Sequence, residues 1–355
     1  MKKNILILST VFVLMLVVYL LVERPGTDIY RDRGKKSGPV FPDLKQDSVR
    51  AVEIKGSRYS VTLRKTDKEW MVDDGEGFPA DEEAVESLLQ DVAAMTYSEI
   101  ASENKENHAL FEVDDLKGVK VRLLDGKNQP LAAFIVGKFG QGPEISYIRE
   151  DGANTVTLQK GLHRFRFDQP AQNWKDRTVM KFDPTKATGL EINRVVMSKV
   201  KEGEIAEVVG NERLLFVMSD GGWSMIEPEK KPARKTELDN ILTILSGMKA
   251  AGIPDQKAAG AGLESPGIAA AVTMRDGTIH VMQVGNENPD RPNEFFARNA
   301  DKPHVFSISA YQVSKLMEPV ESLTQETKSG TSAGSVDENI NNLDPGVLES
   351  AAPPR

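Results

Sequence analysis

The chain has 355 residues, which is longer than one typical domain, and its 39% hydrophobic content is enough for packed cores, so two medium-sized domains are expected. A net charge of −8 and a pI near 5.3 argue against a nucleic-acid-binding surface, which needs a dominant basic patch. The absence of cysteine excludes disulfides, thiolate nucleophiles, cysteine-ligated metals and an N-terminal lipidated cysteine, but it does not fix the compartment.

The first segment of the chain has the composition of a membrane anchor. Residues 5–22 form an uncharged apolar run after Lys2 and Lys3. As a helix this run is about 27 Å long, close to the thickness of the hydrocarbon core. A cleaved signal peptide is the alternative, but no small-x-small cleavage site is found after the run. We therefore expect a transmembrane signal-anchor at residues 1–22 and, because residues 23–48 are charged and contain several glycines and prolines, a tether there.

Two opposing arguments bear on the orientation of this anchor. Five basic residues after the run outnumber the two before it, which by the positive-inside rule favours a cytoplasmic body. An anchor this close to the N-terminus, however, usually translocates the rest of the chain. We favour the second argument and predict a single-pass protein of the inner (cytoplasmic) membrane with a periplasmic or otherwise extracytoplasmic body.

Two parts of the chain repeat the same pattern 153 residues apart. Trp70 and Pro79 correspond at this spacing to Trp223 and Pro232. Each tryptophan lies in a short predicted strand, and after it come a turn and a helix with apolar residues at i, i+3, i+4 and i+7. The predicted core positions of the two helices are Val85, Leu88, Leu89, Val92 and Met95, and Leu238, Ile241, Leu242, Leu245 and Met248. The spacing therefore indicates a duplicated domain.

Alternating apolar and polar residues predict the strands of both copies. In the first copy, residues 49–180, they lie at 49–54, 59–63, 69–72, 119–124, 131–137, 147–149 and 155–158. In the second copy, residues 181–320, they begin near 189–192 and continue at 270–275, 280–285, 296–298 and 305–306.

The two copies also share a predicted tight hairpin. Asp125-Gly126 and Asp276-Gly277 each come directly after a predicted strand, and glycine supplies the positive φ that a tight turn requires. The spacing falls to 151 residues here and to 148 at Gly137 and Gly285, as small deletions in hairpins would produce. The second copy has an additional arm, residues 199–211, predicted to be a protruding hairpin, and residues 321–355 have the composition of a disordered tail.

No catalytic, cofactor-binding or metal-ligating residue is predicted. None of the four histidines has a second histidine at i+4 with a glutamate between, so each is interpreted as a surface or turn residue: His108, His163, His280 and His304. The glycines of residues 137–142 have the wrong order for a phosphate-binding loop, and a hairpin loop is favoured. No nucleophile elbow, Walker A run or kinase motif occurs.

Two acidic loops are candidates for calcium sites. They contain Asp73, Asp74 and Glu76 in the first copy, and Glu287, Asp290 and Glu294 beside Asn286, Asn288 and Asn293 in the second. Neither has the regular alternation of ligands in a calcium-binding loop, so solvated turns are favoured.

Residues 163–167 with Trp174, Lys175 and Arg177 mix aromatic and basic side chains. This mixture suits a membrane surface or an acidic partner. The interpretation that we favour is a short amphipathic helix with Leu162 and Phe165 packed inward, and with Asp176 paired to Arg177 at its end. Trp70 and Trp223 are interpreted as core residues, because both lie in strand-like runs.

These features in this order resemble domain of unknown function family 4340. The resemblance covers about residues 50–317. It rests on Glu69-Trp70, residues 78–81, 110–113, Asp125-Gly126, residues 135–137 and 147–149, and, in the second copy, Trp223 and residues 262–266 and 284–285. The family tends to show Gly-Leu-Asp-x-Pro where residues 110–114 stand, so that turn is expected to differ. The resemblance implies a bacterial membrane-anchored protein, similar to accessory components of ABC transporters of the gliding-motility type, and it implies no catalytic residues.

The fold expected from the sequence is α+β, with two tandem related domains, each an antiparallel sheet with one main packed helix, preceded by a single transmembrane helix. The predicted function is that of a non-enzymatic, membrane-anchored accessory or scaffold protein of a membrane complex, with no cofactor and no nucleic acid. The alternative is an extracytoplasmic ligand-binding module for glycan or peptide, using the cleft between the repeats. A hydrolase is a third hypothesis, which would need several titratable groups with perturbed pKa values in one pocket.

Overall fold

The computed structural model describes residues 38–325 except 98, 143, 199–207 and 257–259. The chain divides into two compact units. The first comprises the chain up to Lys65 together with Glu83–Pro170, and the second comprises Thr66–Glu82 together with the chain from Ala171 onward. The division at Pro170 lies ten residues before the predicted boundary at residue 180, and residues 66–82 group with the second unit rather than the first. Their backbone hydrogen bonds explain this, because Asp81 N–H donates to the carbonyl of Trp174 and Asp176 N–H donates to that of Pro79.

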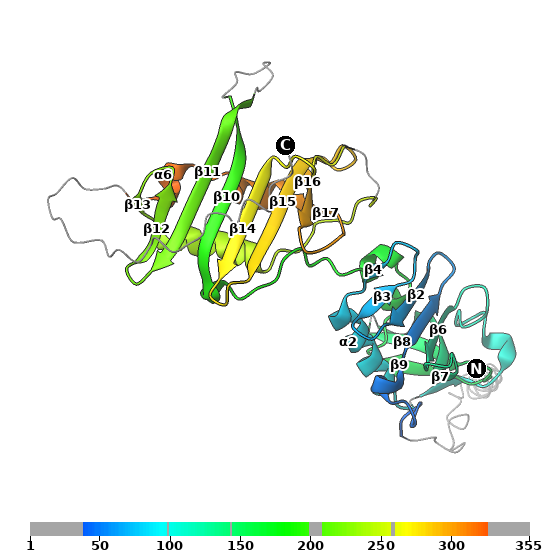
Figure 1. Ribbon diagram of the computed structural model, residues 1–355. Coiled ribbons are helices and arrows are strands. Elements are labelled where there is room, and N and C mark those ends of the chain that lie inside the picture. The colour runs from blue at the N-terminus through cyan, green and yellow to red at the C-terminus, as the bar shows by residue number, and fades with distance from the viewer. Residues whose placement is uncertain (1–37, 98, 143, 199–207, 257–259, 326–355) are drawn as a thin grey trace, which may run out of the picture. The chain divides into compact units, whose positions relative to one another are not determined.

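The first sheet is antiparallel and has nine strands in the order β4-β3-β2-β1-β6-β7-β8-β9-β5 (Figure 1). Most of them cover the predicted strands, but β4 and β5 were not predicted. The strands are β1 (Ala51–Lys55), β2 (Ser60–Lys65), β3 (Trp70–Val72), β4 (Phe78–Pro79), β5 (Ile100–Ser102), β6 (Val119–Leu124), β7 (Pro130–Phe139), β8 (Ile145–Glu150) and β9 (Val156–Lys160).

The second sheet repeats this order with eight strands, β13-β12-β11-β10-β14-β15-β16-β17. Each strand takes the place of one strand of the first sheet, and β5 is an addition to the first sheet alone. The duplication predicted from the sequence is therefore confirmed. The strands are β10 (Ala187–Met197), β11 (Val208–Ser219), β12 (Gly222–Glu227), β13 (Lys231–Pro232), β14 (Ile268–Met274), β15 (Ile279–Glu287), β16 (Glu294–Asn299) and β17 (Phe306–Ser309).

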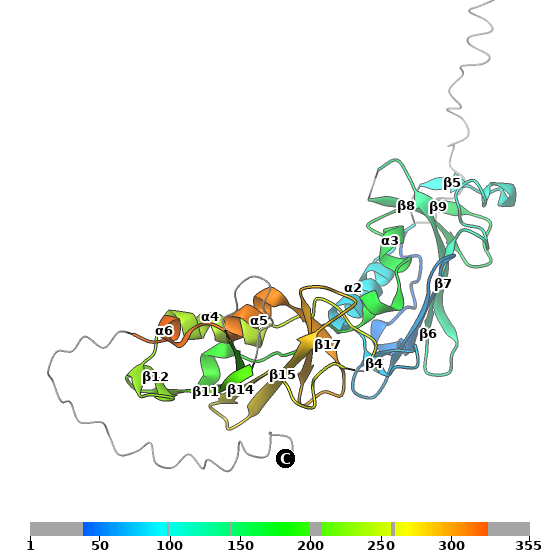
Figure 2. The ribbon, with the colours of Figure 1, turned by 90° about the horizontal axis from the view of Figure 1, so that it is seen from above.

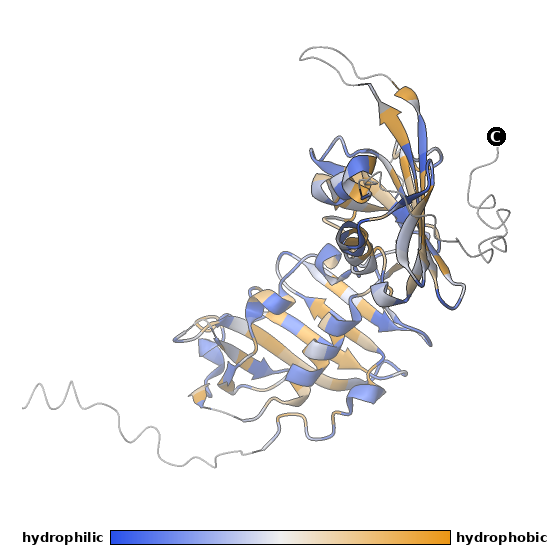
Figure 3. Ribbon diagram, turned by 90° about the vertical axis from the view of Figure 1, so that its left-hand side faces the viewer, coloured by the Kyte–Doolittle hydropathy of each residue, from blue (hydrophilic) through white to orange (hydrophobic). Residues whose placement is uncertain are grey.

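The two main helices are α2 (Glu82–Ala93) and α4 (Lys235–Ser246), and all ten predicted core residues in and just after them are buried. The second sheet is covered on one face by α4 together with α5 (Ala310–Leu316) and α6 (Val320–Leu323), which were not predicted (Figure 2). The remaining helical segments are short: η1 (Gln46–Ser48), η2 (Lys105–Asn107), α3 (Arg164–Phe167), η3 (Ala171–Trp174) and η4 (Pro184–Lys186). Figure 3 shows hydrophobic residues concentrated in the strands.

Several predictions concern residues outside the described part of the chain. These are the transmembrane helix, most of the tether and the tail, in residues 1–37 and 326–355. Within the described residues, no helix is both long and apolar enough to cross a bilayer. Of the predicted arm, residues 199–211, only 208–211 are described, and they belong to β11. Strands β10 and β11 pair as far as Met197 and Val208.

One glycine in each repeat holds a loop against the sheet. Gly137 on β7 and Gly285 on β15 lie directly under a backbone carbonyl, from Phe111 and from Ala261. A Cβ atom at Gly137 would lie 2.2 Å from the Phe111 oxygen, and one at Gly285 would lie 1.9 Å from the Ala261 oxygen. The same carbonyl accepts a hydrogen bond from the next residue of the strand, Lys138 at 3.1 Å or Asn286 at 2.9 Å. Only glycine permits this close approach.

The two repeats share a left-handed residue at the same place in this loop, so the first turn differs less than expected. Glu112, with φ of 57°, comes after Phe111, and Gly262, with φ of 71°, comes after Ala261. The next residue, Val113 or Leu263, is buried in each case. The first repeat therefore has a glutamate in the left-handed conformation where the second repeat has a glycine, at a modest cost in strain.

The two hairpins have loops of the same length, but the Asp-Gly step lies at a different position in each loop. Gly277 has the expected positive φ of 84°, but in the first hairpin it is Asn128, with φ of 59°, that takes the left-handed conformation. The N–H of Asp125 bonds to the carbonyl of Gln129 at 2.9 Å, and the N–H of Met274 bonds to that of Thr278 at 2.8 Å, so both loops are longer than a tight two-residue turn.

We predict that Gly137→Ala and Gly285→Ala each lower the free energy of unfolding by about 1–3 kcal/mol, because the added Cβ forces a backbone carbonyl away from the strand. Urea denaturation of the full-length chain in detergent, monitored by tryptophan fluorescence, measures this. Gly126→Ala and Gly267→Ala are matched controls, since their nearest atoms lie 3.7 and 3.9 Å from the new Cβ. Equal effects at all four positions would contradict the proposed role of the close approach.

Candidate functional site

The second sheet leaves one face uncovered by the described part of the chain. Along β14 the residues Ile268, Ala270, Val272 and Met274 are buried, and those between them are partly exposed. The buried set packs with α4, α5 and α6 in one hydrophobic core. Among the described residues of the second unit, no helix packs on the opposite face (Figure 2). We call this surface the open face of the second sheet.

A polar network crosses three strands of the open face. Glu191 on β10 accepts hydrogen bonds from Arg213 Nε on β11 at 2.9 Å and from Asn193 Nδ2 at 2.8 Å. The second carboxylate oxygen of Glu191 lies 3.4 Å from Arg213 Nη2, so the contact is bidentate. Arg213 Nη1 also pairs with Glu227 on β12 at 3.2 Å. One guanidinium thus joins two carboxylates from separate strands.

Neighbouring side chains in the sheet make Glu191 almost inaccessible, although no described helix or strand covers it. Its side chain is 8% exposed. Leu215 on β11 and Ala271 on β14 are its partners in register. A carboxylate with so little solvent needs its cation, because burying an unpaired charge is costly.

The electrostatics of the network favour a permanent charge pair. The hydrogen bond to Glu191 raises the pKa of Arg213 above its ordinary value, and burial opposes this only partly. Arg213 therefore remains cationic under all physiological conditions. With two carboxylates and one guanidinium, the network presents one excess negative charge on a partly apolar surface.

The first sheet has a related pair at the corresponding position. Glu53 on β1 lies between buried Val52 and Ile54, as Glu191 lies between Leu190 and Ile192 on β10. Arg122 on β6 is directly opposite Glu53 in register, with Nη1 to Oε2 at 3.1 Å. In the second sheet the residue opposite Glu191 on β14 is Ala271, and the arginine comes from β11 instead.

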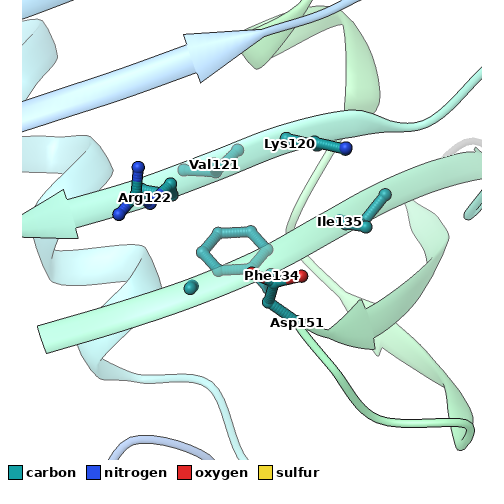
Figure 4. Close-up of a pocket in the computed structure, with 7 residues that line it drawn as sticks. Lys120, Val121, Arg122, Phe134, Ile135 and Asp151 are labelled. Carbon is teal, nitrogen blue, oxygen red and sulfur yellow. The ribbon is translucent and has the colours of Figure 1, made fainter. Parts of the chain in front are cut away.

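A small cavity lies beside Arg122 on the same sheet (Figure 4). Its volume of about 30 Å³ is lined by residues of β6 and β7 and by Asp151. This space suits a single water molecule rather than an organic ligand. Its lining includes Lys120, Arg122 and Ile135.

A second charged cluster, in the second unit, surrounds a buried lysine. Lys175 is 3% exposed, and its Nζ lies 2.7 Å from Asp74 and 2.5 Å from Glu76 in the turn between β3 and β4. The ammonium also lies 5.2 Å from the centre of the Phe78 ring. Burial lowers the pKa of Lys175, but its hydrogen bonds to Asp74 and Glu76 outweigh burial, and the pKa lies above its ordinary value. The acidic turn, predicted to be merely solvated, is thus held by an ion pair.

His304 also contacts Phe78. The two ring centres are 4.1 Å apart, and His304 Nε2 is 3.2 Å from the carbonyl oxygen of Gly77. Burial lowers the pKa of His304 below its ordinary value, with Lys302 and Lys175 adding to this effect. The imidazole is therefore neutral at physiological pH, consistent with a packing role.

The other three histidines are far from forming a common site. His108 Nε2 contacts the carbonyl of Asn154 at 2.9 Å, His163 stacks on Phe165, and His280 stacks on Phe182. Among the described residues, no group of three or more histidine, aspartate or glutamate side chains has the geometry of a metal site.

The remaining loops fit the simpler interpretations. Residues 137–142 end β7 and form the hairpin to β8, as predicted. In the second acidic loop, Asn288 Oδ1 caps the N–H of Asp290, and Glu287 accepts from the N–H of Asn293. Glu294 is paired with Arg291 at 3.6 Å. These carboxylates and amides stabilise the loop itself.

The prediction for residues 163–177 was partly wrong. A short helix does form at α3, and Leu162 is buried, but Phe165 is 62% exposed and Phe167 packs inward instead. Asp176 pairs with Lys302 at 3.7 Å rather than with Arg177. Trp70 and Trp223 are buried, as predicted.

Taken together, these observations define a duplicated α+β protein with one polar open sheet face in its second half. The profile of the domain of unknown function family 4340 (DUF4340) matches the chain twice, over residues 70–266 and 223–327. The matches begin at Trp70 and Trp223, the pair whose spacing indicates the duplication. The chain therefore belongs to the DUF4340 family. No curated protein and no solved structure matches it.

Replacing Arg213 should show how much an unpaired Glu191 carboxylate lowers the free energy of unfolding. We predict that Arg213→Leu destabilises the protein by about 1–3 kcal/mol, whereas Arg213→Leu with Glu191→Leu recovers much of this loss, because the neighbours of Glu191 are apolar. A double-mutant cycle in urea should give a coupling of about 1 kcal/mol or more. The exposed pair Lys235 and Asp239 on α4 is the control, with an expected coupling of about 0.3–0.5 kcal/mol. Equal couplings would contradict the buried-charge argument.

Lys175→Met tests the second cluster by its dependence on pH. Since the folded state raises the pKa of Lys175 above 10.5, the ion pairs stabilise fully below that pH, and their contribution is lost as pH rises through the higher folded-state pKa. We expect the variant to be less stable by about 1–3 kcal/mol at neutral pH. The difference from the natural chain should shrink above pH 10.5 in urea denaturation. A constant difference up to strongly alkaline pH would contradict the prediction.

Proposed function

We propose that this protein is a non-enzymatic, membrane-anchored extracytoplasmic accessory or scaffold protein of a membrane complex, with ABC-transporter subunits as its partners. The open face of the second sheet is the observation that carries the proposal. It presents a broad row of partly exposed side chains, including Leu215, Val217 and Val281, next to the Glu191 network. A fixed ion pair surrounded by apolar side chains is typical of a surface that recognises another protein.

The N-terminal sequence supports the membrane part of the proposal. Residues 5–22 are long and apolar enough to span a bilayer as a helix, and they precede the first unit by a short segment. The family resemblance adds the expected setting, a bacterial inner membrane with an associated transporter.

The charged clusters support a structural rather than a catalytic role. The pKa of Lys175 and that of Arg213 are both raised, so each side chain is held in its cationic form by neighbouring carboxylates. A catalytic lysine needs the opposite shift, because its neutral amine is the nucleophile or base. Both clusters join separate segments of the chain, as structural ion pairs do.

The partner should contact the open face and not the helical face. A photo-crosslinking amino acid at Thr273, on the open face of β14, is compared with the same amino acid at Thr243, exposed on α4. In native membranes we expect position 273 to crosslink to a subunit of a membrane complex, identified by mass spectrometry, and position 243 to give little product. Equal yields at the two positions, or no partner at position 273 in membrane-bound protein, would contradict the proposal.

The orientation is tested separately in spheroplasts. An extracytoplasmic body is digested by added protease, whereas a cytoplasmic body is protected until the membrane is lysed. Protection would overturn the proposed localisation, whatever the crosslinking experiment shows.

The ligand-binding function stays a prediction from the sequence. Thermal-shift screening of the full-length chain with glycans and peptides measures it, because a ligand that binds the folded state raises its melting temperature.

A further inference from the structure

Exposed apolar side chains gather at one end of the first sheet. Phe165 on α3 is 62% exposed, and Phe139 at the end of β7 is 44% exposed. The centres of these two rings are 6.4 Å apart, and His163 stacks on Phe165 at 5.2 Å with nearly parallel planes. Exposed aromatic side chains in contact with each other, rather than scattered singly, mark an interaction surface.

Leu116 belongs to the same end of the sheet. It is 85% exposed and precedes Lys117, whose carbonyl accepts a hydrogen bond from Arg164 Nη2 on α3 at 2.5 Å. Arg164 Nη1 also pairs with Glu112 at 3.0 Å, which fastens this loop to α3. We call Leu116, Phe139 and Phe165 the apolar tip of the first unit.

The described chain begins at this end of the sheet as well. The carbonyl of Gly38 accepts from Tyr97 N–H at 3.0 Å, and Val40 N–H donates to Met95. The backbone carbonyl of Thr96, the residue between Met95 and Tyr97, accepts a hydrogen bond from Gln159 Nε2 at 2.8 Å. Gln159 lies near the end of β9. That end of β9 leads directly to α3, and it pairs with the start of β8, where Ile145 is opposite Lys160. Phe139 is paired with Ser146 beside it.

The amino-acid chain limits how far this end can be from a membrane. Fifteen residues separate Val22, the end of the apolar run, from Gly38. Even fully extended, they span at most about 54 Å. The end of the sheet that carries the apolar tip is therefore the end nearest along the chain to the predicted span.

We propose that the apolar tip rests in the interface of the lipid bilayer that holds the N-terminal anchor. This inference deepens the proposed function, because it relies on the membrane anchor and adds which surface of the body contacts lipid. Phenylalanine and leucine side chains that insert into the interface bury apolar area there.

The charges around the tip agree with a lipid surface. Two carboxylates beside α3 are neutralised within the protein: Glu112 pairs with Arg164, and Asp91 pairs with Arg166. Asp115, which precedes Leu116, is paired with Lys120 at 2.7 Å. Lys117 and Lys138 adjoin Leu116 and Phe139 in the sequence and add positive charge, which attracts anionic lipid headgroups.

The absence of cysteine makes a direct test simple. Single variants Phe165→Cys and Leu116→Cys carry an environment-sensitive fluorophore, and Tyr311→Cys, at a side chain that is 64% exposed in the second unit, is the matched control. Each full-length variant is reconstituted into vesicles of phosphatidylcholine and phosphatidylglycerol, with and without nitroxide-labelled phosphatidylcholine. We expect nitroxide lipids to quench the fluorophore at positions 165 and 116 about threefold more than at position 311.

The failures of the two proposals are distinguishable. If alkaline carbonate leaves the chain in the vesicles but the fluorophores at positions 165 and 116 are quenched no more than at position 311, the apolar tip does not contact lipid and this inference is overturned. If carbonate releases the chain from the vesicles, the anchor itself is disproved, and both the proposed function and this inference fall.

Discussion

The contact on which both repeats depend is a backbone carbonyl placed directly on a strand glycine. At Gly137 and Gly285 the strand has no side chain, so the preceding loop lies flat against the sheet and bonds to the next residue of the strand. In the first repeat this contact fixes the loop that carries Glu112 and Leu116. Glu112 in turn pairs with Arg164 and sets the position of α3. The position of the apolar tip thus depends on the contact between the Phe111 carbonyl and Gly137, which is possible only because residue 137 has no Cβ atom.

Helices cover only one face of the second sheet among the described residues, and this explains the properties of the open face. Alternate residues of each strand must be apolar where they meet α4, α5 and α6, and the residues between them remain at a partly solvated surface. A charged side chain on that surface is shielded by its neighbours in the sheet rather than by a second layer. This is why Glu191 is nearly inaccessible on an open face and why it needs both Arg213 and Asn193.

Local periodicity in the sequence was sufficient to predict the elements that depend on it. Strand alternation, the two apolar helix stripes and the 153-residue spacing were enough for the positions of most strands along the chain and for the duplication, but not for the order of the strands in each sheet. Contacts distant in sequence were missed, such as Lys175 with Glu76, because no local pattern encodes them. Phe165 was placed wrongly because helical spacing was applied from Leu162, although α3 begins only at Arg164. Strand β5 has three residues, none of them fully buried, and therefore no alternation to detect. Glu191 lies in a recognisable strand, but which face of a sheet stays uncovered depends on the helices.

The position of the arginine partner differs between the repeats, and this has a consequence for the evolutionary history of the molecule. Glu53 meets an arginine on one neighbouring strand, and Glu191 meets an arginine on the other. Each repeat therefore neutralises its carboxylate with an arginine from a different neighbouring strand. A residue-by-residue superposition of the two halves would place Arg122 on Ala271. From that alone, the second half would seem to lack the ion pair. Covariation within each half treated separately should instead link different strand pairs, β1 with β6 in one and β10 with β11 in the other.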